Sequence, residues 1–335
     1  MEARYLDFSV IFNVEHGGHF LRNALLSAQR LGWPTESFEI IVISPDKDKD
    51  TGKQVAKASD GNHTIRFLTS SASTSSARLN AACTAARGRI LAFADDDCEL
   101  VTDWLHRIDA AFKANPDAGL IGGVDALHPT ANAFSVALDC VLGSFIGTAG
   151  CRRANGPRLG RSYPKLQNMA IKREMAEQVV EERGGDTFFL FDERLTVHLD
   201  VDLAKRVEHL GMRALMCPDV VVYHWRDTTF WKFLQRNFMM AQTSRLIGVH
   251  RLAHMALAAA GAVVLVLAVG ALWFQFMRVA LVICMAVYCA LLLWCALNGY
   301  WRTRKLAVLG LIPSLLAAVH MARAIGYVVP ARQKM

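Results

Sequence analysis

The sequence contains no aspartate or glutamate after Asp227, although the remaining tail keeps eleven lysine and arginine residues. Residues 1–227 therefore hold 26 of the 37 basic side chains against all 30 acidic ones. This part carries a net charge of −4, and the formal charge of +7 for the whole chain comes from the tail. A nucleic-acid-binding surface needs basic residues gathered on the folded part, so the charge balance argues against nucleic acid as a partner.

The cysteine patterns of a zinc site or a disulfide framework are also missing. The eight cysteines include no CxxC pair and no cluster with histidine; five are scattered through the first 217 residues and three lie in an apolar run. The N-terminal segment MEARYLDFSV lacks the charged-then-apolar pattern of a signal peptide, so we expect nothing to export the chain. Both absences predict free thiols in a reducing compartment.

Three long apolar runs fill the acid-free tail, at residues 252–276, 279–297 and 306–329. About 20 apolar residues cross a bilayer as a helix, so the first two runs are predicted to span it. The third run contains Pro313, His320 and Arg323, and an arginine deep in lipid costs about 3 kcal/mol or more. That run either spans with Arg323 facing protein or snorkelling, or lies in the interface. The competing interpretation of the tail is a buried helical hairpin in a soluble protein.

Basic residues between the second and third runs predict the orientation. Arg302, Arg304 and Lys305 lie in this loop, and short basic loops stay in the cytoplasm. Two spans before the loop place the N-terminal domain on the same side. We therefore expect a multi-pass protein of the cytoplasmic (inner) membrane whose soluble domain faces the cytoplasm.

Short apolar segments alternate with amphipathic segments in the first hundred residues. Strands are predicted at FSVIF (8–12), FEIIVI (38–43), TIRFL (64–68) and RILAFA (89–94), with helices at 20–30, 52–59 and 76–87. Continuous apolar strands that alternate with helices are typical of a parallel sheet covered on both faces. The fold class is therefore α/β, with a mostly parallel sheet, and ligands of such sheets bind beyond the carboxyl ends of the strands.

Three adjacent aspartates follow the fourth predicted strand, in the stretch LAFADDDCEL. Asp95, Asp96 and Asp97 repel one another, so a cation, a basic group or solvent has to offset them. Carboxylates suit Mg²⁺ or Mn²⁺, and Mg²⁺ commonly binds one or two carboxylates together with substrate phosphates. Taken alone, the run is equally compatible with a solvated cluster that caps the following helix.

The order of four motifs resembles the family 2 glycosyltransferases of GT-A fold. The motifs are FSVIF, FEIIVI, ARLNAACTAARGRILAFADDDCELVTDWL and FDERLTVHLDVDLAKRVEHLGMRALMCPDVVVYH, which together cover residues 8–224. The apolar tail is similar to that of membrane-anchored members that assemble bacterial polysaccharides. We therefore divide the chain into a GT-A catalytic domain at 1–227, an amphipathic interfacial helix at 228–250 and a membrane domain at 251–335.

The resemblance assigns the three aspartates to the family's DxD motif. Asp95 matches the aspartate that meets the nucleotide and approaches the metal, and Asp97 matches the metal ligand. Asp96 occupies the variable middle position, which we place on the nucleotide-sugar side. His224 matches a histidine that approaches the metal or diphosphate in some relatives; the alternative for this residue is a purely structural role.

The same resemblance assigns residues on the donor and acceptor sides. Arg78 and Asn80 match an Arg-x-Asn pair near the nucleotide, although a surface charge is the alternative for Arg78. Asp200 matches the general base, and its alternative is a helix cap. Leu199 stands where relatives carry the glutamate of a Glu-Asp pair, and Asp202 is the next candidate base.

Two departures from the family pattern concern the nucleotide. Relatives commonly have an Asp-Asp-Gly-Ser run after the second strand, whereas this chain reads Ser44-Pro45-Asp46-Lys47, so Asp46 is the candidate there. Asn13 and Glu15 occupy the turn after the first strand, in place of the usual Pro-Thr-Tyr-Asn. The identity of the base therefore stays open.

Three further segments flank the predicted site. The apolar segment 134–147 is either a core helix or a membrane-facing wall for a lipid-linked acceptor. The basic segment 150–165 either clasps diphosphate or anionic headgroups or is a solvated loop. Residues 228–246 predict an interfacial helix or a packed connector, and they lack the Gln-x-x-Arg-Trp motif of processive synthases.

The resemblance implies an inverting, metal-dependent transfer from a nucleotide-sugar donor to a lipid-linked or glycan acceptor, with Mg²⁺ or Mn²⁺ as cofactor. Membrane association and partners in a polysaccharide-assembly complex fit the same interpretation. Two alternatives stay open: a processive synthase with a membrane channel, and a non-catalytic scaffold that binds sugar nucleotides.

Overall fold

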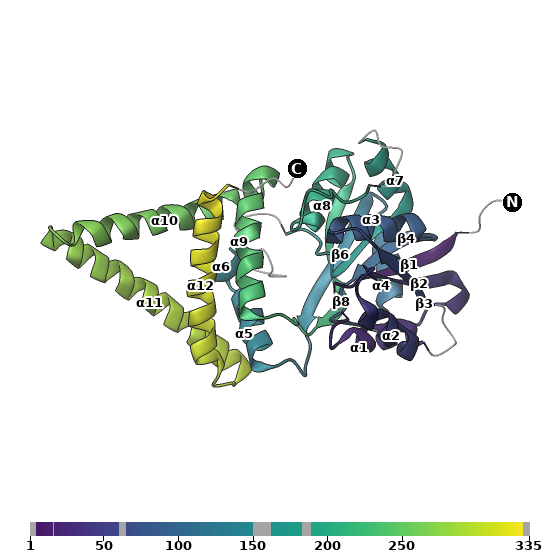
Figure 1. Ribbon diagram of the computed structural model, residues 1–335, viewed down its shortest axis with the longest axis horizontal. Coiled ribbons are helices and arrows are strands. Elements are labelled where there is room, and N and C mark those ends of the chain that lie inside the picture. Colours follow the sequence, from purple (N-terminus) through teal and green to yellow (C-terminus); the bar gives the residue numbers. More distant parts are fainter. Residues whose placement is uncertain (1–4, 16, 60–64, 150–161, 183–188, 331–335) are drawn as a thin grey trace. The chain divides into compact units, whose positions relative to one another are not determined.

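The computed structural model describes residues 5–15, 17–59, 65–149, 162–182 and 189–330. The chain divides into two compact units (Figure 1). The first unit comprises Met1–Pro129 and Tyr163–Trp225, and the second comprises Thr130–Ser162 and Arg226–Met335. The first is an α/β unit and the second is helical, and each is described here by itself.

An eight-stranded sheet organises the α/β unit, in the order β3-β2-β1-β4-β7-β6-β8-β5. The strands are β1 (Leu6–Asn13), β2 (Phe38–Pro45), β3 (Ile65–Ser70), β4 (Gly88–Ala94), β5 (Cys98–Leu100), β6 (Ala118–Leu127), β7 (Asn168–Lys172) and β8 (Arg213–His224). The four strands predicted from apolar runs are all present. β1 and β2 bury nearly every side chain, which is why they read as continuous apolar stretches.

Helices cover both faces of this sheet. One hydrophobic core cluster joins the sheet to α1 (Leu21–Gln29), α2 (Lys49–Ala58) and α4 (Trp104–Ala114). The other joins it to α3 (Ser75–Ala85), α7 (Arg173–Glu181) and α8 (Leu199–His209). A short 3-10 helix, Thr35–Ser37, precedes β2. The predicted α/β class with a doubly covered sheet is confirmed.

The sheet is mixed, because three of its strand pairs are antiparallel. β1, β2, β3 and β4 pair in parallel, as does β6 with β8. β7 runs antiparallel to both β4 and β6, and β5 runs antiparallel to β8. The sequence did not predict β5, β6 or β7: β5 and β7 have only three and five residues, and two adjacent glycines interrupt the apolar run of β6.

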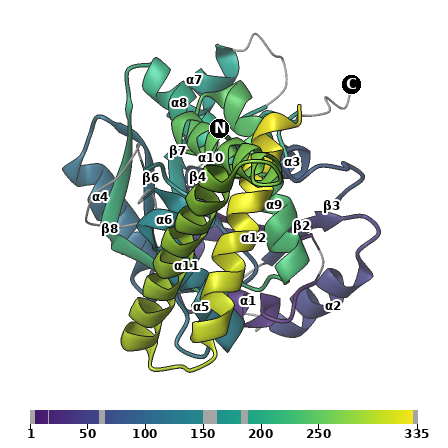
Figure 2. The same ribbon diagram turned by 90° about the vertical axis from the view of Figure 1, so that its left-hand side faces the viewer.

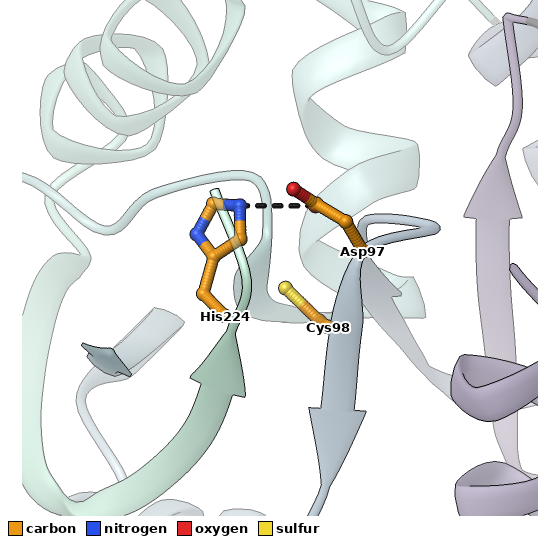
Figure 3. A group of neighbouring side chains, drawn as sticks. All are labelled: Asp97, Cys98 and His224. Atoms are coloured by element: carbon orange, nitrogen blue, oxygen red, sulfur yellow. Dashed lines mark ion pairs between the residues drawn. The ribbon is translucent and has the colours of Figure 1, made fainter. Parts of the chain in front are cut away.

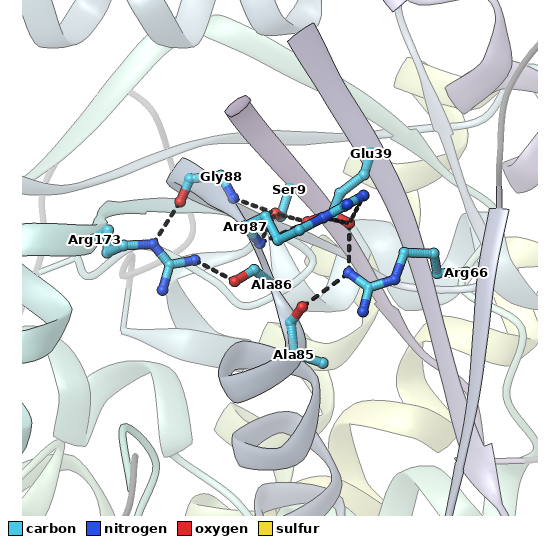
Figure 4. A network of polar contacts seen from close by, with 8 residues as sticks. All are labelled: Ser9, Glu39, Arg66, Ala85, Ala86, Arg87, Gly88 and Arg173. Atoms are coloured by element: carbon cyan, nitrogen blue, oxygen red, sulfur yellow. Dashed lines mark hydrogen bonds and ion pairs between the residues drawn. The ribbon is translucent and has the colours of Figure 1, made fainter. Parts of the chain in front are cut away.

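A buried carboxylate ties together the starts of β1, β2 and β4, away from the strand ends where ligands are expected (Figure 4). Glu39 accepts hydrogen bonds from the Ser9 hydroxyl (2.8 Å) and from an Arg66 guanidinium nitrogen (2.6 Å). It also accepts from the backbone N–H of Arg87 (2.6 Å). Burial raises the pKa of Glu39, but the bonds from Arg66, Ser9 and Arg87 outweigh burial and hold it below its usual 4.5.

Glu39→Gln is expected to lower the free energy of unfolding by about 1–3 kcal/mol, because buried donors lose a charged acceptor. A carboxylate whose pKa is lower in the folded state than in the unfolded state stabilises the fold at every pH above its unfolded-state pKa. This stabilisation is lost as the pH falls through the folded-state pKa. The wild type should therefore lose thermal stability below about pH 4.5, and the variant should lose less of it. Thermal unfolding between pH 3 and 7 measures both effects. The exposed Glu36→Gln is the control, and equal pH curves for Glu39→Gln and the wild type would contradict this role.

The helical unit contains three helices that are long and apolar enough to cross a membrane: α10 (Arg251–Gly270), α11 (Gln275–Thr303) and α12 (Val308–Val328). The shorter helices of the unit are α5 (Ala133–Leu142), α6 (Phe145–Thr148) and α9 (Phe230–Ile247). α10 and α11 leave most side chains exposed, whereas α12 buries about a third of its most apolar window, 33%. α9 and α12 run side by side (Figures 1 and 2).

The polar residues of α12 contact other parts of the helical unit. Arg323 donates to the Asn237 side chain on α9 (2.9 Å) and to the carbonyl of Gly147 on α6. A ring nitrogen of His320 lies 3.0 Å from the carbonyl oxygen of Ile146. Of the alternatives for the third apolar run, these contacts support an Arg323 that faces protein. The apolar segment 134–147 forms α5 and α6 of the same unit.

Candidate active site

The aspartate run forms a tight turn between β4 and β5. β4 ends at Ala94, and the N–H of Cys98 donates to the carbonyl of Asp95 (3.1 Å). Asp96 and Asp97 are therefore the central residues of a four-residue turn. The turn lies beyond the carboxyl end of β4, as predicted from the sequence.

The short strand β5 brings this turn to the end of β8. Cys98 is the register partner of His224, and the N–H of Trp225 donates to the carbonyl of Asp97 (3.0 Å). Backbone pairing thus places Asp97 beside His224, as Figure 3 shows.

His224 lies between two carboxylates. Its Nε2 is 2.9 Å from Oδ1 of Asp97, and its Nδ1 is 3.5 Å from Oδ2 of Asp125. A neutral imidazole has a single N–H, so it can donate to only one of these two carboxylates. A second proton or a cation has to satisfy the other. A carboxylate near the second nitrogen of a metal-binding histidine commonly orients the ring, and Asp125 lies near Nδ1 here, although 3.5 Å is long for a hydrogen bond.

Cys98 completes a group of three side chains whose ligand atoms lie within 4.8 Å of one another, the other two being Asp97 and His224. Burial raises the pKa of the Cys98 thiol well above its usual 9.0. The negative charges of Asp95, Asp97 and Asp125 raise it further. Without a bound cation the thiol therefore stays protonated, and Mg²⁺ and Mn²⁺ prefer oxygen and imidazole ligands to sulfur.

An aromatic stack holds the residue that follows His224. Trp225 stacks on Phe20 with ring centroids 4.6 Å apart, and on His128 with centroids 3.9 Å apart. Nε2 of His128 lies 2.8 Å from Oε2 of Glu99, and the backbone N–H of His128 donates to the His224 carbonyl (3.0 Å). These contacts fix the end of β8 and with it the position of the imidazole.

Arg78, Asn13 and Glu15 form a second cluster, beyond the carboxyl end of β1. Nε of Arg78 donates to Oδ1 of Asn13 (3.3 Å), and its NH2 lies 3.5 Å from Oε1 of Glu15. Arg78 is 3% exposed, so the alternative interpretation as a surface charge is wrong. The structure therefore brings three of the residues assigned to the nucleotide together.

Asn80 lies on the same helix but has a different set of partners. Its amide nitrogen donates to the Phe191 carbonyl (3.0 Å) and to the Glu193 carboxylate (2.9 Å). Its amide oxygen accepts from the Phe191 N–H (2.8 Å). Asn80 thus holds the segment before α8 in place, and its three bonds leave little of its amide for a nucleotide.

Asp46 is exposed beyond β2, and its backbone N–H donates to the Ser70 carbonyl (3.1 Å). Two residues later, Asp48 caps α2 and accepts from the Gly17 N–H (3.0 Å) and from the N–H and hydroxyl of Thr51. Burial raises the pKa of Asp48, but the bonds from Thr51 and its neighbours outweigh burial and lower it. Sequence reasoning missed Asp48, although Asp48-x-x-Thr51 has the spacing of a helix N-cap.

Asp200 lies in the first turn of α8, which begins at Leu199. Its Oδ2 is 3.3 Å from Nζ of Lys165, and its Oδ1 accepts from the Val201 N–H (2.9 Å). Burial raises the pKa of Asp200, but the charges of Lys165 and His198 outweigh burial and lower it. The residue before α8, His198, has a left-handed backbone conformation (φ 64°).

Asp202 has a separate partner on its own helix. Its Oδ2 accepts from Nε of Arg206 (3.0 Å), one turn later. Arg206 also donates to the Leu190 carbonyl (2.6 Å). Asp202 therefore belongs to a structural pair. Sequence reasoning missed Asp125 and Gln167, and it placed Lys165 in the basic segment 150–165 without its contact to Asp200. Most of that segment lies outside the described residues.

Comparison with known proteins gives one family and one well-matched fold. A family model for "Glycosyl transferase family 2" matches residues 9–171, slightly under half of the chain. No curated protein gives a significant match. A solved structure of the mannosyltransferase PcManGT from Pyrobaculum calidifontis, in complex with GDP-Man and Mn²⁺, is 18% identical with a TM-score of 0.63. That similarity covers 95% of this chain and 87% of the other, and it shows a shared fold. S. aureus TarS is more distant: 14% identical, TM-score 0.46, covering 71% of this chain and 39% of the other.

Proposed function

Because residues 9–171 form a glycosyl transferase family 2 domain, we propose that this glycosyltransferase is inverting and metal-dependent and acts on a lipid-linked or glycan acceptor. The observation that carries the proposal is the position of His224 at the end of β8, between Asp97 and Asp125 and beside the aspartate turn that follows β4. A neutral imidazole between two carboxylates leaves one of them for a second proton or a cation, and a nucleoside diphosphate needs a cation as its counter-charge when it leaves, so we assign a cation to this site.

Asp97 and His224 would hold the metal ion, with Asp95 at the start of the same turn as the further candidate. Asp125 would orient the imidazole through Nδ1. An imidazole ligand favours a transition metal such as Mn²⁺ over Mg²⁺, whose usual ligands are oxygens. The bound cation would supply charge stabilisation to the leaving diphosphate.

The nucleotide would lie across the carboxyl ends of β1, β2 and β4. Arg78, fixed by Asn13 and Glu15, would offer its guanidinium to the nucleotide, while Asp46 and Asp96 would meet the base or ribose from neighbouring turns. Asn80 would act on this side only indirectly, through the segment at Phe191.

Asp200 would be the general base. Its carboxylate would take the proton from the acceptor hydroxyl as the new bond forms at the anomeric carbon. The bond from that carbon to the diphosphate breaks in the same displacement, which inverts the configuration. The lowered pKa keeps Asp200 ionised, and so able to accept a proton, at neutral pH.

A panel of nucleotide sugars tests the function, with GDP-mannose and UDP-N-acetylglucosamine included. We expect Mn²⁺-dependent release of the nucleoside diphosphate from at least one donor, abolished by EDTA and restored by added Mn²⁺. A non-catalytic scaffold would bind a donor without releasing diphosphate, and release that is insensitive to EDTA would contradict the metal assignment.

The helical unit would hold the catalytic unit at the cytoplasmic face of the membrane. α10 and α11 expose most of their apolar side chains, and they are joined by the short turn 271–274. A pair of spanning helices returns the chain to the side on which it entered. Arg302 lies in the last turn of α11, and Arg304 and Lys305 follow the helix, so this end would be the cytoplasmic one.

Single-cysteine variants at the two ends of α11 test this topology. A membrane-impermeant maleimide added to intact cells should label Ala271→Cys, in the turn between α10 and α11, and should miss Thr303→Cys until the cells are opened. Efficient labelling of Thr303→Cys in intact cells would overturn the orientation, and with it the access of the site to cytoplasmic nucleotide sugar.

A further inference from the structure

The turn formed by residues 165–168 contacts both ends of the candidate active site. We propose that Lys165, its first residue, is a positioning residue that fixes the carboxylate of Asp200 for the reaction. The proposal rests on the proposed role of Asp200 as the base and adds the group that holds it. The Asn168 N–H closes the turn by donating to the Lys165 carbonyl (2.8 Å), immediately before β7.

Asn168 anchors the turn in the core. Its amide nitrogen donates to the carbonyls of Val124 and Val220 (both 3.0 Å). Its amide oxygen accepts from the indole N–H of Trp104 (2.9 Å). The side chain is 1% exposed, so all these bonds are shielded from water. The turn therefore has one defined position against β6 and β8.

Two adjacent glycines allow the chain to approach this closely. A Cβ atom at Gly122 would lie 2.4 Å from Cβ of Pro164, the residue before the turn. A Cβ atom at Gly123 would lie 1.8 Å from the Val220 carbonyl oxygen and 2.5 Å from the amide nitrogen of Asn168. The register of β6 against β8 shifts at this point. The glycine pair thus seats the turn, and with it the backbone of Lys165.

Side chains from the turn reach in two directions. Gln167 donates to Oδ2 of Asp125 (3.1 Å), the carboxylate that faces His224. Lys165 reaches Oδ2 of Asp200 at 3.3 Å. Both members of this ion pair are largely shielded, with 17% and 15% of their side chains exposed. One rigid turn therefore sets the base relative to the candidate metal ligands.

The Asp200 carboxylate is held at both oxygens. Lys165 occupies one position on Oδ2, and the Val201 N–H occupies one on Oδ1. A carboxylate oxygen accepts two hydrogen bonds, so each oxygen keeps a position for an acceptor hydroxyl. The ammonium of Lys165 keeps its proton throughout: the proton from the acceptor moves to Asp200, and Lys165 only orients the group that receives it.

The charge of Lys165 also predicts a pH signature. The charged and titratable groups that act on Asp200 are Lys165, from the turn, and His198, from the residue before α8. Both lower the pKa of Asp200 against the effect of burial. Removal of the ammonium should therefore raise this pKa, and the acidic limb of the rate profile should move to higher pH.

Lys165→Met and Lys165→Arg test the proposal in the full-length chain, with the donor that the wild type hydrolyses most rapidly as probe. Lys165→Met should lower kcat about 10- to 100-fold, as expected for a misplaced catalytic group, and should shift the acidic limb upward. Lys165→Arg should keep most of the wild-type kcat and an acidic limb close to that of the wild type. Binding of GDP or UDP with Mn²⁺ should be unchanged in each. His198→Asn measures the contribution of the His198 imidazole to the pH profile, separately from that of Lys165. Asparagine is chosen because it tolerates the left-handed backbone conformation of this position.

Lys172→Met is the matched control, because Lys172 lies on β7 and its contacts within the described residues are the Pro116 carbonyl and the Phe112 ring. It should behave as the wild type does. A Lys165→Met variant with wild-type rate and pH profile would overturn the proposal. So would a variant that is slower only because it binds the donor more weakly, since Lys165 would then be a donor ligand.

Lys165→Met in an Asp200→Asn background separates this proposal from the proposed function. If Asp200→Asn alone keeps the wild-type rate, the base assignment is wrong. If Asp200→Asn is slow and Lys165→Met slows it further by its full factor, the base stands and the positioning role falls. The melting temperatures of the wild type, Asp200→Asn, Lys165→Met and the double variant give a second readout that needs no substrate. Non-additive changes support the contact, and additive ones overturn it.

Discussion

Asp200→Asn should transfer sugar about 10²–10⁴ times more slowly than the wild type, the usual effect of removing a general base. Asparagine has the shape of aspartate and keeps an oxygen that can accept from the Val201 N–H, so the fold should be retained. It cannot take a proton from the acceptor. Donor binding should persist, because the candidate metal ligands Asp97 and His224 form a separate cluster. Steady-state kinetics and calorimetric titration with GDP or UDP measure the two properties.

Asp202→Asn is the control for this experiment. Asp202 belongs to the same helix and pairs with the largely shielded Arg206, so its substitution should cost about 1–3 kcal/mol of stability and leave the rate unchanged. If Asp200 only stabilised the start of α8, both variants would show stability changes and normal rates. A normal rate in Asp200→Asn would place the base elsewhere.

Asp97→Ala should abolish Mn²⁺-dependent binding of the nucleotide, and Asp95→Ala should weaken it. Asp97 supplies the carboxylate that lies 2.9 Å from His224, so its loss removes half of the candidate ligand pair. Titration of GDP and UDP with Mn²⁺ and with EDTA measures the change. Asp103→Ala removes an exposed acid just beyond β5 and should bind as the wild type does. Metal-dependent binding of normal strength in Asp97→Ala would show that the ion lies elsewhere.

The sequence predicted the parallel half of the sheet and the elements around it. β1, β2 and most of β4 are buried on both faces, so each appears as a nearly continuous apolar run, whereas β3 lies at the edge and is only partly buried. Asp97 was placed at the end of such a run. The apolar tail was also evident, because helices exposed to lipid must be apolar on all sides over about 20 residues.

β5, β6 and β7 were beyond prediction because their pairing depends on distant partners. β5 is a strand only because β8 pairs with it, and the three residues Cys98–Leu100 have no pattern of their own. Lys165 and Asp200 meet across 35 positions of sequence through a turn that a pair of glycines admits. Such contacts follow from tertiary packing, which overrides local preference.

Asn80 illustrates the same limit for a site residue. Its place in an Arg-x-Asn pair suggested a contact with the nucleotide, but the structure uses its amide to hold Phe191. Arg78, two positions earlier on the same helix, contacts Asn13 and Glu15. A motif specifies residue types and spacing, whereas the partner of each side chain depends on which segments arrive later in the chain.

The pairing of β5 with β8 has a consequence for synthesis. Asp97 and His224 are separated by more than one hundred residues, and backbone bonds between the two strands bring them together. During translation, domains fold progressively from the N-terminus, and contacts between distant segments form late. A nascent chain that has completed β1 to β4 carries the aspartate turn without its histidine. The protein therefore gains its candidate metal site only when nearly the whole soluble part has left the ribosome, just before the apolar helices emerge. On the proposed assignment, a growing chain would therefore carry the aspartate turn but lack the histidine ligand until β8 pairs with β5.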